Sequence, residues 1–240
     1  MTPEKINDGT EVSAFYTEGR NDFESEEDRV IVQQPLVVRM LAHLFSYLFH
    51  PLFIPGYVTA FLLYVHPYAF AGFGDKLKLL RLISVVLLTA FFPAFSVFLL
   101  RRLGFADSLF LRTRKERIIP YIISMFFYFW IFYVSRNLQG SPPLFVTFLL
   151  GLFISSIAAL MANIYFKVSM HAMGMGGLFA FFVMLSMEGS FPMGIYVSLT
   201  LLISGLVCTS RMIVSNHYPF EIYVGFLLGI FCELVALFFT

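Results

Sequence analysis

Long apolar runs are the feature that most constrains this chain. Six stretches consist almost entirely of Leu, Phe, Ile, Val and other apolar residues: about 78–101, 118–136, 143–163, 168–187, 191–209 and 220–239. About 20 apolar residues in a helix cross the hydrocarbon core of a bilayer. Charged residues make up only 13% of the 240 residues, about half the share usual in a soluble domain. The sequence therefore predicts a multi-pass membrane protein.

The pattern inside the runs predicts the fold class. None of them alternates apolar and polar residues with the period of two that a membrane barrel needs, so we expect an all-α, polytopic membrane helix bundle with six secure spans. A seventh apolar segment, 36–66, is interrupted by Pro51 and Pro55. It also carries Arg39, His43 and His50. We expect this kinked N-terminal segment to be an interfacial helix that leads into a bent span.

The acidic residues are concentrated at the start of the chain. Residues 1–35 hold nine of the fifteen Asp and Glu and lack the basic start and apolar core of a signal peptide. We predict a mostly disordered tail over 1–35 and the helical bundle over 36–240. The net charge of +1 offers no basic face for phosphate backbones, so no nucleic-acid partner is expected. The expected partners are membrane lipids, and the oligomeric state is left open.

Three polar connections fall on the same side of the membrane when the crossings are counted. They are residues 102–117, 164–171 and 210–219. Their polar side chains include Arg112, Arg114, Lys115, Arg117, Lys167, Ser169, His171, Ser210, Arg211, Asn216 and His217. Ionisable groups near the membrane are costly and often functional. We therefore expect a site at this end of the bundle, although a basic loop can also reflect topology alone.

The last connection has the most informative spacing. His217 and Glu221 are four residues apart at the start of a predicted helix, so they share one face. The carboxylate can hold one imidazole nitrogen and leave the other free to act as a base or a nucleophile. Arg211 offers planar donors that suit phosphate oxygens, and the start of the last helix favours an anion.

These residues resemble motifs of the type-2 phosphatidic acid phosphatase superfamily, the lipid-phosphate phosphatases related to vanadium haloperoxidases. The third motif of that family is Ser-Arg, five residues, His, three residues, Asp. This chain has Ser210-Arg211, five residues, His217, three residues and Glu221, followed by Gly225. The second motif is Pro-Ser-Gly-His, and here Ser169-Met170-His171 keeps the Ser and the His. The matching segments are 112–120, 167–177 and 210–225, and the resemblance is weakest in the first.

The resemblance implies a metal-independent phosphatase that works through a phosphohistidine and needs no cofactor. His217 would attack phosphorus, Glu221 would orient it, and His171 would protonate the leaving oxygen and then activate water. The phosphoryl oxygens would be held by six residues: Arg114, Lys115, Arg117, Lys167, Ser169 and Arg211. The first motif of the family is Lys, six residues, Arg-Pro. This chain has the same residue types at a different spacing, in Arg114-Lys115-Glu116-Arg117-Ile-Ile-Pro120.

Two departures from the family pattern keep alternatives open. Glu221 replaces an Asp, which lengthens the orienting arm, and Met170 replaces a Gly, which adds bulk beside the phosphate. The alternatives are a non-catalytic lipid-phosphate binding or carrier protein that uses a degenerate pocket, a Zn²⁺ site made of two histidines and a carboxylate, and a plain transporter or structural bundle. The nearby cations argue against the Zn²⁺ site because they repel a dication.

The substrate class follows from the resemblance only in outline. Undecaprenyl diphosphate, phosphatidic acid, phosphatidylglycerol phosphate and lipid A phosphate all carry an anionic head on an apolar anchor, and the sequence does not choose among them. We expect the plasma (inner) membrane as the location. The basic connections favour a cytoplasmic site, whereas the family more often works at the outer face.

Overall fold

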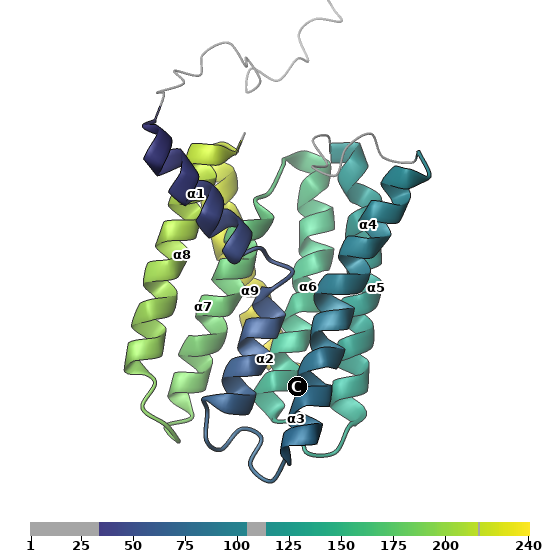
Figure 1. The fold of residues 1–240 in the computed structure, drawn as a ribbon, viewed down its shortest axis with the longest axis vertical. Helices are drawn as coiled ribbons and strands as arrows, with labels where there is room; N and C mark the ends of the chain where they lie inside the picture. Colours follow the sequence, from purple (N-terminus) through teal and green to yellow (C-terminus); the bar gives the residue numbers. More distant parts are fainter. Residues whose placement is uncertain (1–33, 105–113, 216) are drawn as a thin grey trace, which may run out of the picture. The chain divides into compact units, whose positions relative to one another are not determined.

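The computed structural model describes residues 34–104, 114–215 and 217–240. The chain divides into two units, Met1–Gln34 and Pro35–Thr240, and the second unit is described below. The predicted acidic tail lies outside the described residues, apart from its last two positions. Within the described residues, the second unit consists of helices and contains no strand (Figure 1). Its elements are α1 Leu36–Leu48, α2 Ile54–Tyr64, α3 Asp75–Val86, η2 Leu87–Phe91, α4 Phe92–Arg102, α5 Arg114–Asn137, α6 Pro143–Tyr165, α7 Met170–Met187, α8 Gly194–Val214 and α9 Pro219–Leu237.

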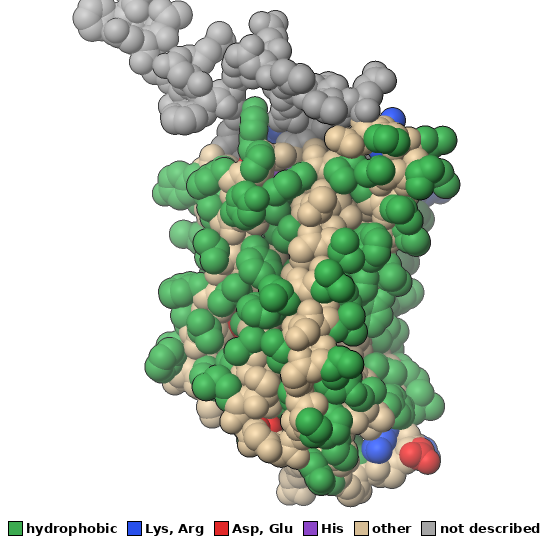
Figure 2. Space-filling model, turned by 90° about the vertical axis from the view of Figure 1, so that its left-hand side faces the viewer, with side chains coloured by type: hydrophobic (Ala, Val, Ile, Leu, Met, Phe, Trp, Pro, Cys, Tyr) green, Lys and Arg blue, Asp and Glu red, His purple; other side chains and the backbone are tan. Residues whose placement is uncertain are grey.

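Six helices in the described part of the chain are long and apolar enough to cross a membrane. They are Asp75–Arg102, Arg117–Asn137, Pro143–Tyr165, Met170–Met187, Gly194–Val214 and Pro219–Leu237, which agree with the six predicted runs. Hydrophobic side chains cover most of the face seen in Figure 2, and charged side chains appear mainly near its ends. The protein is therefore an all-α, multi-pass membrane protein, as predicted.

The first span is continuous but irregular. A π-helical turn, η2, joins α3 to α4 just before Pro93. Proline lacks an N–H group and its ring crowds the carbonyl four residues earlier, so a wider turn relieves the clash. The span therefore crosses as one helix despite its proline.

The N-terminal apolar segment is broken where the sequence predicts. α1 ends at Leu48 and α2 begins at Ile54, with Pro51 between them. Pro55 instead lies in the first turn of α2, where a missing N–H costs no helical hydrogen bond. Helices α1 and α2 have 13 and 11 residues, so each is shorter than a full span. The predicted kink is confirmed.

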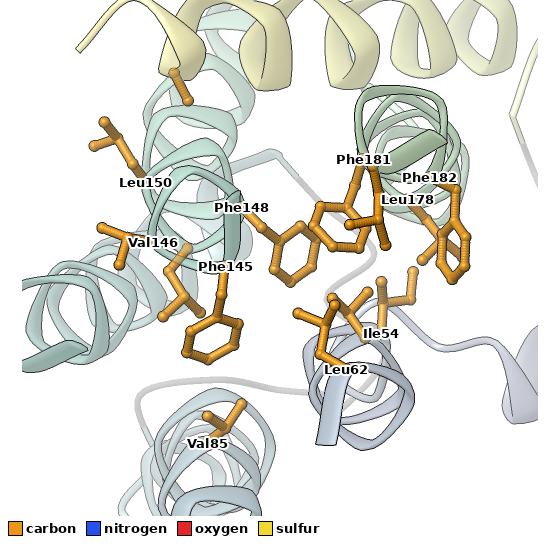
Figure 3. Packing of buried hydrophobic residues seen from close by; sticks show 14 of the residues in the cluster. Ile54, Leu62, Val85, Phe145, Val146, Phe148, Leu150, Leu178, Phe181 and Phe182 are labelled. Carbon is orange, nitrogen blue, oxygen red and sulfur yellow. The ribbon is translucent and has the colours of Figure 1, made fainter. Parts of the chain in front are cut away.

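The apolar core holds α2 against the longer helices. Ile54 and Leu62 of α2 are buried with Phe148 of α6 and Phe181 of α7 (Figure 3). The rings of Phe148 and Phe181 have centroids 5.0 Å apart, within the favourable range for an aromatic pair. The start of α2 and the turn before it lie next to the N-terminal half of α7, because a Cβ added at Gly174 would be 2.8 Å from Ile54 Cδ1 and 3.4 Å from Pro51 Cβ.

Helices α7 and α9 approach each other through glycines. A Cβ added at Gly176 would lie 2.0 Å from the Phe226 carbonyl oxygen, and one added at Gly229 would lie 2.0 Å from the Met173 carbonyl oxygen. Both obstacles are backbone atoms, which cannot rotate away. Close backbone approach at small residues is a common way for membrane helices to associate. The two glycines therefore set the distance between α7 and α9.

We expect Gly229→Ala to destabilise the bundle, because the new methyl group would force α7 and α9 apart. Overpacking of this kind costs about 1–3 kcal/mol, or a fall in melting temperature of roughly 3–10 °C for a chain of this size. The measurement is thermal unfolding of the purified protein in detergent. Gly205→Ala in α8 is the matched control, because a Cβ there meets no atom within 4 Å. Equal melting temperatures for the two variants would contradict the glycine contact.

Candidate active site at one end of the bundle

The order of the helices brings two connections to the same end of the bundle. α6 ends at Tyr165 and α7 begins at Met170, while α8 ends at Val214 and α9 begins at Pro219. Both connections lie at the upper end in Figure 1, where α4 also ends and α5 begins. This is the arrangement that counting the crossings predicts. Helix direction alone therefore places the two histidine segments and the start of α5 at one end.

His217 is held by Glu221. The imidazole Nδ1 lies 2.8 Å from Glu221 Oε2, and the side chains are only 8% and 9% exposed. The same Oε2 accepts the backbone N–H of Tyr218 at 3.1 Å. A carboxylate on Nδ1 places the proton on that nitrogen and leaves a lone pair on Nε2. Glu221 thus reaches His217 and makes the orienting bond that the sequence predicts.

Ser169 joins the two histidine segments. Its backbone N–H donates to the Glu221 carbonyl oxygen at 3.3 Å, and its hydroxyl caps α7 by accepting the Ala172 N–H at 3.5 Å. Gly225 makes this contact possible, because a Cβ there would lie 2.8 Å from the Ser169 carbonyl oxygen. Ser169 is fully buried, and its N–H is already used. Its visible role is to position α7 against α9, while a role in phosphate binding stays a prediction.

His171 lies at the start of α7 and bonds to a different helix. Its Nε2 lies 3.1 Å from the Ser46 carbonyl oxygen of α1. Because a carbonyl only accepts, Nε2 carries a proton, and Nδ1 has the lone pair in the neutral ring. Arg211, His50 and His217 all interact electrostatically with this imidazole. The two predicted histidines and the predicted arginine are therefore close enough to interact electrostatically.

Arg211 supplies a half-buried cation to this cluster. It lies in the last turn of α8, and its guanidinium interacts electrostatically with Arg117 of α5. Its Nε is buried and has no hydrogen-bond partner among the described residues. A buried donor without a partner costs about 1–3 kcal/mol, and two nearby guanidinium groups repel each other. A bound anion would relieve both costs.

The other predicted phosphate ligands are less closely tied to the cluster. Lys167 is half-buried in the connection between α6 and α7, and no hydrogen bond or ion pair joins it to the histidines within the described residues. Arg114 and Lys115 lie in the first turn of α5, at the same end, but their side chains lie outside the described part of the structure. Their predicted roles stay untested.

His50 is a member of the cluster that the sequence analysis did not select. It lies in the break between α1 and α2, and its ring centroid is 5.0 Å from that of His171, with the rings nearly perpendicular. Burial, together with the nearby Arg211 charge, lowers the pKa of His50 to about 4. No motif spacing marks this residue, and the only sequence signal is a histidine beside Pro51 in an apolar segment.

The described residues contain no group of three or more His, Cys, Asp or Glu side chains arranged to hold a metal ion. The Zn²⁺ alternative therefore gains no support from the part of the chain that the structure describes. No known protein family, curated protein or solved structure matches this chain.

Proposed function

We propose that this protein hydrolyses a lipid phosphate or lipid diphosphate through a phosphohistidine intermediate. The observation that carries the proposal is the His217–Glu221 bond of 2.8 Å, next to His171 and the partnerless Nε of Arg211. A histidine oriented by a carboxylate can act as a nucleophile, a second histidine can transfer protons, and an arginine guanidinium binds phosphoryl oxygens.

In the first step, the Nε2 lone pair of His217 attacks phosphorus and the bond from phosphorus to the leaving oxygen breaks. Glu221 stabilises the positive charge that develops on the imidazole. The negative charge of the bound phosphate favours a protonated His171, which gives its Nδ1 proton to the leaving oxygen, so the departing alcohol or phosphate is neutralised as it forms. Arg211 and Arg117 stabilise the charge on the remaining phosphoryl oxygens, which is the main requirement for phosphoryl transfer.

In the second step, water attacks the phosphohistidine. His171, now neutral, takes a proton from the water through Nδ1, and the bond between phosphorus and Nε2 of His217 breaks. Inorganic phosphate leaves, and both histidines return to their starting protonation states. The Ser46 carbonyl keeps the His171 ring in one tautomer throughout the cycle, since its bond occupies Nε2.

The site suits a substrate that is anchored in the membrane. The cluster lies at one end of the six candidate spans, where the head group of a membrane lipid would be found. A phosphate on an apolar anchor could reach the cations without leaving the bilayer. The proposed location is the plasma (inner) membrane, and undecaprenyl diphosphate, phosphatidic acid and related lipids are the substrates to compare.

One observation favours the second candidate function, lipid-phosphate binding without turnover. The Ser169 N–H, a predicted phosphate donor, is bonded to the Glu221 carbonyl oxygen instead, and Met170 occupies the position beside His171 that is Gly in the family pattern. A site with fewer donors can bind a phosphate and still stabilise its transition state poorly. The two candidates differ in one measurable outcome, which is release of inorganic phosphate.

We expect the purified protein to release inorganic phosphate from at least one of these lipid phosphates. The release should persist in EDTA and should be inhibited by vanadate. Arg211 and Arg117 neutralise the phosphoryl oxygens directly, so the reaction has no need of an added divalent cation. The assay measures inorganic phosphate with and without EDTA and vanadate. Lipid binding without phosphate release would support the carrier function, and loss of activity in EDTA would contradict the proposed mechanism.

A further inference from the structure

The break between α1 and α2 brings a third imidazole to the proposed site. His50 precedes Pro51, and the following turn packs against α7, where a Cβ added at Gly174 would lie 2.8 Å from Ile54 Cδ1. This contact holds the turn beside the start of α7. The His50 and His171 rings are 5.0 Å apart as a result. The position of His50 is therefore a consequence of tertiary packing against a glycine of α7.

The hydrogen bonding of His50 determines which of its ring nitrogens carries the proton. Its Nδ1 accepts the backbone N–H of Leu52 at 3.3 Å, so in the neutral ring the proton is on Nε2. Burial and the charge of Arg211 keep the pKa of this imidazole at about 4. At neutral pH the ring is therefore uncharged and has one N–H donor. It adds a donor to the cluster without adding a positive charge next to Arg211.

We propose that His50 is a third histidine of this site and donates a hydrogen bond from Nε2 to an oxygen of the bound phosphate group. This inference rests on the proposed function and deepens it. Nε2 of His217 keeps its lone pair to attack phosphorus, and Nδ1 of His171 gives up and regains its proton during the cycle, so neither nitrogen supplies a permanent N–H to the phosphate. His50 has the opposite arrangement, because its lone pair is used by Leu52 and its N–H is available.

Two substitutions separate this role from a purely structural one. In His50→Asn, the amide oxygen can stand near Nδ1 and accept the Leu52 N–H, but no donor reaches the position of Nε2. In His50→Gln, the amide N–H can reach the position of Nε2 and restore the donor. A structural role depends on the bond to Leu52, whereas the proposed role depends on the donor at Nε2.

The experiment compares wild type, His50→Asn and His50→Gln in three measurements: kcat/KM for lipid phosphate, inhibition by inorganic vanadate, and melting temperature. We expect His50→Asn to melt like wild type, and its kcat/KM and vanadate affinity to fall about 10- to 100-fold, as for the loss of one hydrogen bond to a charged group. His50→Gln should recover most of both losses.

The outcomes distinguish this inference from the function on which it rests. If wild type hydrolyses lipid phosphate and His50→Asn does so equally well, or His50→Gln loses as much as His50→Asn, the inference about His50 is overturned and the proposed function stands. If wild type neither binds vanadate nor releases phosphate, the proposed function is overturned, and the role of His50 with it.

Discussion

His217→Ala should reduce phosphate release from the lipid substrate by at least about 1000-fold, because it removes the nucleophile. When each protein is mixed with substrate and quenched, wild type should carry covalently bound phosphate and the variant should carry none. Phosphate release and mass spectrometry of the quenched protein measure the two effects. Binding of the lipid should persist, because Arg211 and Arg117 are unchanged.

The matched control is His43→Ala, which removes another imidazole at an exposed position on α1. We expect its rate to stay within about twofold of wild type, as is usual for surface substitutions away from special features. The melting temperatures of both variants show whether the fold is intact. A His217→Ala protein that keeps full activity would rule out the phosphohistidine mechanism.

His171→Ala should separate the two chemical steps. It removes the proton donor of the first step and the base of the second, so turnover of a lipid phosphate should fall about 100- to 10,000-fold, the usual contribution of general acid–base catalysis. An activated phosphate ester needs no proton on its leaving oxygen, and with such a substrate the first step should still proceed. The phosphohistidine on His217 should then accumulate, because water is no longer activated.

The measurement for His171→Ala is a quenched reaction with an activated ester, followed by mass spectrometry of the peptide that contains His217. A burst of leaving group equal to about one per protein, followed by slow turnover, is the expected kinetic pattern. Phosphate found on His50 or His171 in wild type would reassign the nucleophile. Unchanged turnover of the lipid substrate in His171→Ala would show that this histidine transfers no proton.

Local patterns in the sequence were sufficient to predict the membrane-spanning helices. Runs of about 20 apolar residues predict spans because the bilayer has no water for unpaired backbone groups, and Pro51 predicts the break between α1 and α2 because proline cannot continue a helix. The spacing of His217 and Glu221 predicts their bond, since residues four apart share a helix face. Counting the crossings predicts that both histidine segments lie at one end.

Contacts between segments that are distant in the sequence could not be predicted from such local patterns. The place of His50 beside His171 depends on how the turn after α1 packs against Gly174, and the bond from Ser169 to the Glu221 carbonyl depends on Gly225. Glu233 in α9 is another example, because it is 1% exposed and no local sequence pattern predicts its burial. Its carboxylate packs against Gly151 of α6, where an added Cβ would lie 2.0 Å from Oε2.

The sequence alone determines the membrane spans, the break at Pro51 and the His217–Glu221 pair, because each depends on residues within a few helical turns of one another. The three-histidine cluster has a different origin. It forms because glycines let α7 and α9 approach to backbone contact and let the turn at Pro51 pack on α7, and this fit depends on the shapes of surfaces that are far apart in the chain. Only the tertiary structure decides which imidazoles, bonds and cations share the site.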